Sequence, residues 1–174
     1  MDSGRTRSVC RLREEGGNRY RRAMSVLRDF PDLPPVWMLG HAALAWVAST
    51  IVPLVSFGGT GTRMIGGALA LVGIALSVWA AAWFARRRTT IEPRETPTRL
   101  IVEGPFRLNR NPIYTGMALV LAGWALWLGT LSAVLAVLPF TFVITNRFIR
   151  GEEAALRDAF GFEADAYLDR SRRW

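Results

Sequence analysis

The stretch NPIYTGMALVLAGWALWLGTLSAVLAVLPFTFVITN, residues 111–146, decides the fold, because its 36 residues include no charged side chain. One straight helix of this length would be about 54 Å long, at about 1.5 Å per residue. The hydrocarbon core of a bilayer is only about 30 Å thick. We therefore predict that the run folds back at WLGTLS, residues 127–132, where Gly129 ends one helix and Thr130 or Ser132 begins the next.

Two further runs, 36–57 and 64–85, contain 22 residues each without Arg, Asp or Glu. About 20 apolar residues are enough to cross a bilayer as a helix. The sequence thus predicts an all-α integral membrane protein with four transmembrane helices, followed by a cytoplasmic C-terminal helix. The four predicted spans, of which the last two form a tight hairpin, are 36–57, 64–85, 112–128 and 131–148. This pattern excludes a soluble globule and a disordered chain.

The 22 basic residues are all Arg and fall into three clusters, in 1–30, 86–110 and 147–173, with Arg63 alone outside them. Basic residues gather on the cytoplasmic side of membrane proteins. We expect a multi-pass protein of the cell membrane with both termini cytoplasmic, and the clustering argues against nucleic-acid binding. Residues 1–35 are polar and basic and lack the pattern of a signal peptide. We expect them to form a disordered tail, and residues 36–174 to form the membrane domain.

Cysteine and histidine are too scarce for several kinds of chemistry. The sequence has one cysteine, Cys10, and one histidine, His41. A disulfide framework, a thiolate or histidine metal site and a Ser-His-Asp triad are therefore excluded, and we expect no metal.

Small residues recur at helical spacing in the second and third predicted spans. The second span carries Gly66, Ala70, Gly73 and Ser77, and the third carries Thr115, Ala118, Ala122, Ala125 and Gly129. Such stripes let helix backbones approach closely in lipid, and we expect both to serve helix packing.

The segment TRLIVEGPFRLNRNPIYTGM, residues 98–117, precedes and begins the third span. Asn111 suits an N-cap, and Pro112 suits the first helical position. Free N–H groups at this helix start, with Arg107 and Arg110 just before it, would suit a carboxylate or a phosphate. The same two arginines would equally suit lipid headgroups, and the residues alone leave both interpretations open.

The stretch RFIRGEEAALRDAFGFEADAY, residues 147–167, contains two adjacent glutamates. Consecutive residues on an α-helix lie about 100° apart, so Glu152 and Glu153 should face different sides. Helical periodicity puts Glu152 in register with Phe148 and Leu156, on the apolar side. It puts Glu153 four residues before Arg157, at an exposed ion-pair spacing. We therefore expect Glu152 to point inward, where it is a functional candidate or a partner of a nearby arginine.

These motifs occur together in one known group of proteins. Gly104-Pro105-Phe106-Arg107, Arg110-Asn111-Pro112-Ile113-Tyr114, a helical hairpin, Glu152-Glu153 and Phe160-Gly161 with Tyr167 follow one another in this order. Over about residues 86–174 the chain resembles the isoprenylcysteine carboxyl methyltransferase and phospholipid methyltransferase superfamily. The resemblance implies a membrane enzyme that transfers a methyl group from S-adenosylmethionine to a lipophilic or lipid-anchored acceptor.

The resemblance also implies which residues form the site. The cofactor would be bound by Thr98, Arg99, Leu100, Ile101, Phe106, Arg110, Asn111, Pro112, Ile113, Tyr114, Glu152 and Glu153. Arg150, or else Arg147, would meet the substrate. The chain has Asn111 where the family often has His, and Phe106 where it often has Tyr. Asn111 cannot act as a base near neutral pH, which favours a carboxylate acceptor such as a prenylcysteine-like group over an amine.

Two other classes remain open. A membrane NADPH-dependent reductase has related last helices, although such enzymes usually carry more spans and a distinct C-terminal signature. A non-catalytic membrane subunit would bind no nucleotide-like cofactor. Besides the acceptor, we expect membrane lipids as partners; the oligomeric state does not follow from the sequence.

Overall fold

The computed structural model describes residues 32–87 and 100–174, and Pro34–Trp174 form one compact unit. Within the described ranges the chain is helical, apart from connections and a single β-bridge between Ser56 and Thr130. The helices are α2 (Pro34–Ile51), α3 (Thr60–Arg87), η1 (Gly104–Arg107), α4 (Pro112–Leu128), α5 (Leu131–Val137), α6 (Pro139–Ile144), η2 (Thr145–Ile149), α7 (Arg150–Phe160) and α8 (Phe162–Arg170). The all-helical fold agrees with the sequence-based prediction.

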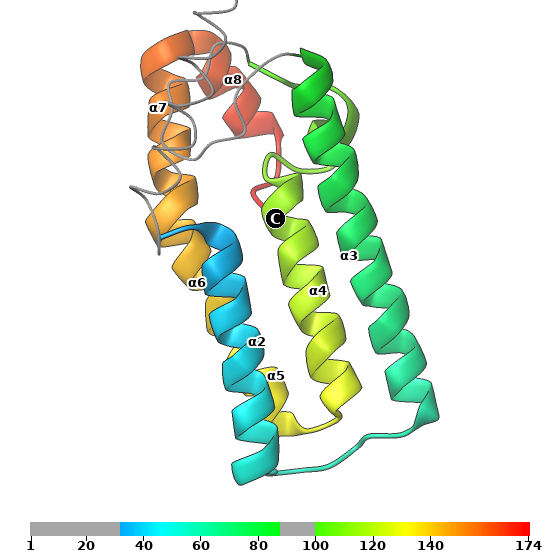
Figure 1. Ribbon diagram of the computed structural model, residues 1–174. Helices are drawn as coiled ribbons and strands as arrows, with labels where there is room; N and C mark the ends of the chain where they lie inside the picture. Colours follow the sequence, from blue (N-terminus) through cyan, green and yellow to red (C-terminus); the bar gives the residue numbers. More distant parts are fainter. Residues whose placement is uncertain (1–31, 88–99) are drawn as a thin grey trace, which may run out of the picture. The chain divides into compact units, whose positions relative to one another are not determined.

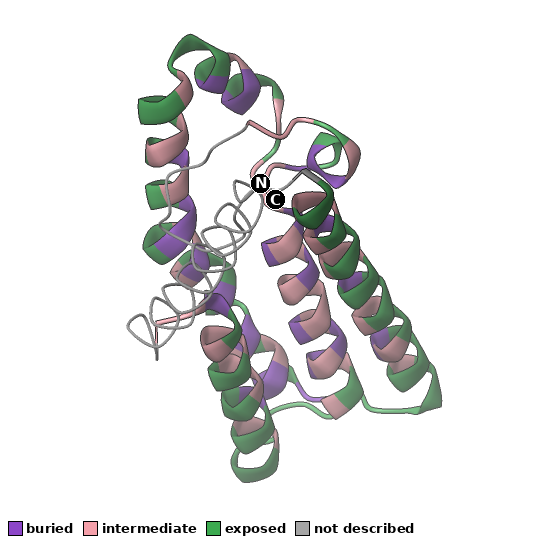
Figure 2. Cartoon of the chain, turned by 45° about the horizontal axis from the view of Figure 1, so that its top comes forward, coloured by how far each residue is buried: buried purple, intermediate pink, exposed green. Residues whose placement is uncertain are grey.

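The helices α2, α3, α4 and α5–α6 run side by side as a bundle, and α7 and α8 continue beyond one end of it (Figure 1). Helix α4 contacts α2, α3, α5 and α6. Its buried side chains join those of α6 and η2 in the hydrophobic core, and the largest members are Tyr114, Leu121, Phe140, Ile144 and Phe148. Figure 2 shows that much of the surface of α2 and α3 is exposed, whereas α4 is mostly covered.

The predicted hairpin between the last two long helices is confirmed. Helix α4 ends at Leu128, and Gly129 adopts the left-handed conformation with φ +66°, its N–H donating to the carbonyl of Ala125 at 3.0 Å. A residue with a Cβ is disfavoured in this conformation, and glycine avoids the penalty. The hydroxyl of Thr130 then accepts from the N–H of Ala133 at 3.3 Å and caps the next helix.

The first predicted span, 36–57, is too long at its C-terminal end, since α2 ends at Ile51. Pro53 has no N–H to donate and disfavours helical geometry in the residue before it. The connection instead pairs with the hairpin turn: the N–H of Phe57 donates to Gly129 at 2.9 Å, and that of Leu131 to Val55 at 2.9 Å. The two turns at this end of the bundle are thereby joined through their backbones.

Glycines bring α3 and α4 into close contact. A Cβ on Gly66 would lie 2.6 Å from the carbonyl oxygen of Gly123, and one on Gly73 would lie 2.5 Å from that of Gly116. The small-residue stripe predicted on α3 therefore does pack against a helix. The α3–α4 contact itself uses Gly116 and Gly123 of α4, whereas Ala118 and Ala125 of the stripe predicted on α4 pack against or within the hydrophobic core. These two glycines are seven residues apart, which is two helical turns.

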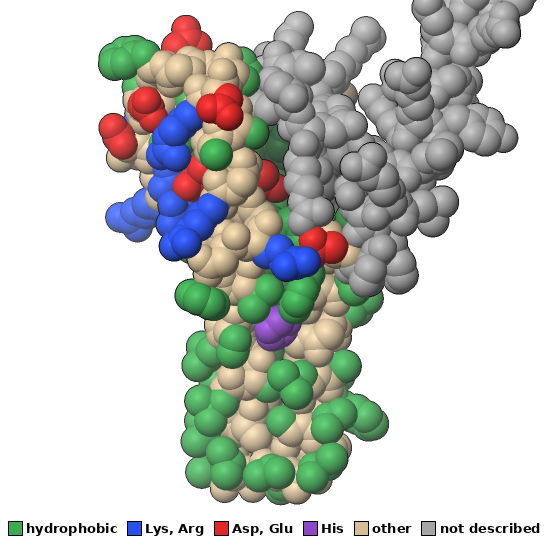
Figure 3. Space-filling model, turned by 90° about the vertical axis from the view of Figure 1, so that its left-hand side faces the viewer, with side chains coloured by type: hydrophobic (Ala, Val, Ile, Leu, Met, Phe, Trp, Pro, Cys, Tyr) green, Lys and Arg blue, Asp and Glu red, His purple; other side chains and the backbone are tan. Residues whose placement is uncertain are grey.

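Two helical stretches are long and apolar enough to cross a membrane, Thr60–Arg86 and Leu131–Phe160. Helix α4 is apolar but shorter, with 17 residues. Side chains exposed along the bundle are largely apolar, and on the face seen in Figure 3 the charged side chains gather at one end. This division is what a helical bundle in a lipid bilayer requires, because charged groups are costly in hydrocarbon.

The stretch Leu131–Phe160 is not a regular α-helix. It contains a turn at Leu138 before Pro139, and residues Thr145–Ile149 form a π-helix in which the N–H of Arg150 donates to the carbonyl of Thr145, five residues earlier. A π-turn holds about one residue more than an α-turn. Residues after it therefore face a direction that α-helical counting assigns to their preceding neighbours. The helix also continues past residue 148, where the predicted span ended.

Candidate functional site

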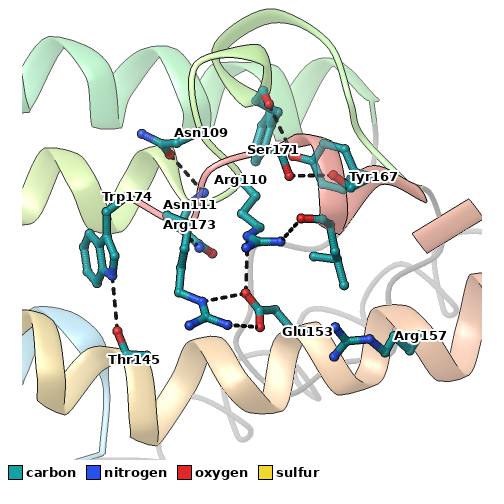
Figure 4. A network of polar contacts seen from close by, with 12 residues as sticks. Asn109, Arg110, Asn111, Thr145, Glu153, Arg157, Tyr167, Ser171, Arg173 and Trp174 are labelled. Atoms are coloured by element: carbon teal, nitrogen blue, oxygen red, sulfur yellow. Dashed lines mark hydrogen bonds and ion pairs between the residues drawn. The ribbon is translucent and has the colours of Figure 1, made fainter. Parts of the chain in front are cut away.

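The motifs expected to form the site meet at the end of the bundle that carries α7 and α8 (Figure 1). Hydrogen bonds and ion pairs join four segments there: residues 106–114, the helical stretch 145–153, α8, and residues 171–174. Figure 4 shows most of these side chains converging between the η2–α7 stretch and the start of α4. Segments 60 residues apart in the sequence thus form one polar cluster.

The sequence Gly104-Pro105-Phe106 packs the linker onto the end of α3. Gly104 has φ +62°, and a Cβ there would lie 2.8 Å from the ring of Trp83. The Phe106 ring meets Phe84 edge to face at 5.2 Å. The hydroxyl of Tyr167 donates to the carbonyl of Phe106 at 3.3 Å, and burial raises the pKa of Tyr167 to about 12. The hydroxyl therefore keeps its proton at neutral pH and remains a donor that ties α8 to the linker.

Asn111 and Pro112 occupy the N-cap and first helical position of α4, as predicted. The predicted capping hydrogen bond is wrong, because the side chain of Asn111 accepts none from the first turn. Its amide instead donates to the carbonyl of Arg173 at 3.0 Å, and its backbone N–H donates to the side chain of buried Asn109 at 3.0 Å. Asn111 therefore holds the last residues of the chain against the start of α4.

Glu153 is the charged centre of the cluster and is only 5% exposed. Arg173 grips both of its oxygens, with Nε 2.9 Å from Oε1 and Nη2 2.7 Å from Oε2 (Figure 4). The Nε of Arg110 lies 3.3 Å from Oε1. The hydrogen bond to this carboxylate raises the pKa of the Arg173 guanidinium. Two guanidiniums thus neutralise one buried carboxylate, and a two-point contact of this kind fixes its orientation.

Arg110 also ties the cluster to the C-terminal part of the chain. Its Nη1 donates to the carbonyl of Leu168 at 2.5 Å, and its backbone N–H donates to the carbonyl of Arg172 at 2.9 Å. The side chain predicted to suit an external anion is therefore engaged with Glu153 and with backbone carbonyls. Arg107, which was predicted to bind the same anion as Arg110, is exposed.

Glu152 has a different environment from that of its neighbour. Its Oε1 accepts a hydrogen bond of 2.5 Å from the hydroxyl of Tyr114, in the first turn of α4. Among the described residues, Tyr114 is the only side chain that binds Glu152, and no arginine pairs with it. No described guanidinium therefore lies beside the half-buried Glu152 carboxyl group to pair with it.

The prediction for Glu152 holds in that its carboxylate points inward to α4. The prediction for Glu153 is wrong, since it is buried and Arg157 pairs with Asp165 at 3.0 Å instead. The cause is the π-turn at Thr145–Ile149, which the spacing rule did not include. With one extra residue in the turn, Phe148 is followed on its face by Glu153 as well as by Glu152.

The remaining predicted site residues are spread more widely. Arg147 lies with its guanidinium 5.5 Å from the ring centroid of Trp37 on α2, and Arg150 is exposed at the start of α7. The carbonyl of Ile113 accepts a hydrogen bond from the hydroxyl of Ser77 at 3.4 Å. Leu100 and Ile101 are half-buried in the segment before η1, whereas Thr98 and Arg99 lie outside the described residues.

Comparison with known proteins identifies the family of this chain. Residues 62–163, more than half of the chain, match the profile of a family described as phospholipid methyltransferase. This chain belongs to that family. The phospholipid methyltransferase family is part of the isoprenylcysteine carboxyl methyltransferase-like superfamily, which confirms the resemblance found in the motifs. Membership implies a methyltransferase associated with membranes.

An uncharacterized protein of Haemophilus influenzae is 40% identical to this family member over 62 residues. The aligned residues are 36% of this chain and 98% of that protein. No solved structure matches the chain.

Sequence reasoning missed Thr145, Ser171 and three further residues of the cluster. Asn109, Arg173 and Trp174 carried no recognisable motif, and the last two lie beyond the range matched by the phospholipid methyltransferase profile. One signal was present: a carboxylate predicted close to the membrane surface demands a cation, and the sequence ends with three arginines in its last five residues.

Proposed function

We propose that this phospholipid methyltransferase family member transfers a methyl group from S-adenosylmethionine to a lipophilic or lipid-anchored acceptor at the cytoplasmic face of the membrane. The observation that carries the proposal is the Glu152 carboxylate, which is bound by the Tyr114 hydroxyl and by no described cation. A family profile implying methyl transfer and two helices able to cross a membrane support the same conclusion.

The residues present fit a cationic cofactor. S-adenosylmethionine carries a sulfonium and an ammonium group, and a half-buried carboxylate without a cationic partner attracts such charges. The hydroxyl of Thr115, next to Tyr114, and the indole N–H of Trp83, beside Gly104, are buried without a hydrogen-bond partner in the described ranges. Buried polar groups are normally paired, so these two are free to meet polar atoms of a ligand.

The proposed mechanism requires little from the chain beyond orientation. When bound, S-adenosylmethionine would supply an electrophilic methyl group for the acceptor, with S-adenosylhomocysteine as the leaving group. Glu152, held by Tyr114, would bind positive charge and orient the cofactor. Holding two reactants in the correct relative position by itself increases the reaction rate strongly.

A carboxylate acceptor is favoured over an amine. A carboxylate is already ionised at neutral pH and needs no base, whereas a protonated amine must first lose a proton. Asn111 offers no base at the start of α4, and its amide is engaged with Arg173. Arg150, exposed at the start of α7, would meet an anionic acceptor, with Arg147 as the second candidate.

We further propose that α2, α3, α4 and the α5–α6 stretch are four spans and that both termini lie in the cytoplasm. The three arginine clusters support this orientation. With four spans, the polar cluster lies on the cytoplasmic side, where the cofactor is available.

Calorimetry on the purified protein tests the cofactor and its contact with Glu152. We expect the wild-type protein to bind S-adenosylmethionine and to show no heat of binding with NADPH. Charge-assisted contacts are worth about 1.5–3 kcal/mol, so Glu152→Gln should bind S-adenosylmethionine about 10- to 100-fold more weakly. The control Glu163→Gln removes an exposed carboxylate on α8 and should bind like the wild type.

Two results would contradict the proposal. Absence of S-adenosylmethionine binding by the wild type would remove the methyltransferase assignment. Equal affinities of wild type and Glu152→Gln would remove Glu152 from the cofactor site. A screen of acceptors with a labelled methyl group then separates carboxylate from amine substrates.

A further inference from the structure

Residues 171–174 form a strap across the candidate site. Their backbone carbonyls accept from Arg110 and Asn111, the guanidinium of Arg173 holds Glu153, and the indole N–H of Trp174 donates to the Thr145 hydroxyl at 3.2 Å (Figure 4). This strap lies beyond residues 62–163 that match the family profile. The match to the family therefore does not explain the contacts of the strap, and their role has to be inferred from the structure of this chain.

The strap is anchored at both ends of the irregular part of the long helix. Trp174 binds Thr145, the first residue of the π-turn, and Arg173 binds Glu153, four residues after its last. π-turns are rare, and the ordinary conformation of such a stretch is the α-helix. If the stretch relaxed to an α-helix, the residues beyond it would turn by about 100°. A strap fixed at Thr145 and Glu153 opposes that rotation.

Glu152 depends on the same rotation. It is the residue before Glu153 on one helix, so fixing the direction of Glu153 also fixes that of Glu152. Arg173 binds both oxygens of Glu153 and forms no hydrogen bond or ion pair with Glu152 among the described residues. The strap thus selects which of the two carboxylates meets Tyr114, and it leaves that carboxylate without a guanidinium.

We infer that Arg173 is a positioning residue: by holding both oxygens of Glu153, it keeps the π-turn and directs the unpaired Glu152 carboxylate to Tyr114. The role of Glu152 toward the cofactor rests on the function proposed above. The positioning itself does not, because it concerns contacts within the chain.

The positioning is tested by thermal unfolding in detergent, without any ligand. Tyr114→Phe removes the hydroxyl that binds Glu152 and should lower Tm in the otherwise wild-type protein. In the Arg173→Gln background the same change should lower Tm by less than half as much, since Glu152 is no longer directed to Tyr114. In the Arg172→Gln background, which removes an exposed neighbouring arginine, the full effect of Tyr114→Phe should return.

An unchanged effect of Tyr114→Phe in the Arg173→Gln background would overturn the inference, because two residues that act separately give additive effects. If Arg173→Gln does not fold, Trp174→Phe replaces it; this change removes the N–H donated to Thr145 together with part of the ring that packs against the core. The same attenuation, or its absence, then decides the matter.

Binding isotherms separate positioning from a general loss of structure. S-adenosylhomocysteine keeps the ammonium group and lacks the sulfonium charge, so it serves as the probe with one positive charge fewer. Arg173→Gln should weaken S-adenosylmethionine binding about tenfold and S-adenosylhomocysteine binding less than about threefold, and Arg173→Lys should recover part of the loss. Equal losses for both probes would contradict the inference. Failure of the wild type to bind either probe contradicts the proposed function alone, and the unfolding experiment still tests the positioning.

Discussion

Adjacent residues Glu152 and Glu153 carry the same side chain but bind different kinds of partner. Glu152 accepts from one hydroxyl, whereas Glu153 lies between two guanidiniums. A buried charge is tolerated when it is paired and hydrogen-bonded, which is the condition that Glu153 fulfils. The two glutamates therefore have separate environments: Glu153 joins the parts of the cluster, and Glu152 is the carboxylate that we propose meets the cofactor.

Replacing Glu153 with Gln should destabilise the protein, because it leaves Arg110 and Arg173 facing a neutral amide. Removing one partner of a buried ion pair costs about 3–5 kcal/mol. We expect about 3 kcal/mol, since the Arg173 side chain is 38% exposed and water can solvate it. Chemical unfolding measures this loss.

The matched control for Glu153→Gln is Glu163→Gln on α8, whose carboxylate is exposed and which should unfold within about 0.5 kcal/mol of the wild type. Equal stability of the two variants would show that the ion pairs around Glu153 contribute nothing. This expectation replaces the sequence-based one, in which Glu153 was exposed and its replacement was expected to have little effect.

The sequence was sufficient at the residue scale wherever a residue's role depends on its immediate neighbours. Gly129, Asn111 and Pro112 occupy the helix-terminal positions that their chemistry predicts. It was insufficient for Glu153 and for the Asn111 amide, because their partners come from residue 173 and no local pattern indicates contacts across 20 to 62 positions. Arg173 itself is recognisable only once the fold has brought it to Glu153.

At the scale of helices, the contact between α3 and α4 depends on glycines at particular positions. Gly66→Ala should lower Tm, because its Cβ would lie 2.6 Å from the Gly123 carbonyl oxygen and the helices would have to separate. The adjacent Gly67→Ala is a matched control, since its Cβ would lie 3.7 Å from the Trp127 ring, at ordinary contact distance. Alanine also favours a helix over glycine by up to about 1 kcal/mol.

Gly67→Ala should therefore match or exceed the wild type in thermal melts, while Gly66→Ala falls below it. The reverse order would mean that α3 presents a different face to α4. Spacing alone identified the face on α3 but not the one on α4, because α4 is apolar and rich in small residues on several sides. Which of them faces α3 is decided by packing against α2 and α5 as well.

For the whole molecule, the arrangement in the membrane makes a prediction about access from outside. On a background without Cys10, Leu54→Cys in the exposed connection after α2 should react with an impermeant thiol reagent on intact cells. Glu163→Cys on α8 should react only after the cells are opened, since the polar cluster is proposed to be cytoplasmic. Strong labelling of position 163 from outside would contradict four spans with both termini inside.

The length and charge pattern predicted the helical class, the hairpin and the membrane character, because these depend on composition over 20 or more residues. They did not predict how the bundle ends. The first helix stops six residues earlier than the uncharged run, since a proline and backbone pairing with the hairpin turn act where hydropathy gives no signal.

The π-turn at Thr145–Ile149 also has a consequence for how relatives of this protein are compared. Position in an alignment and direction in space are separate properties when a helix carries an additional residue. In a homologue of equal length whose helix lacks the π-turn, the first glutamate of an aligned pair faces the direction that the second faces here. Residue roles transferred column by column would then assign ligand contact to the wrong carboxylate, and an insertion or deletion within these five positions is as informative as a substitution.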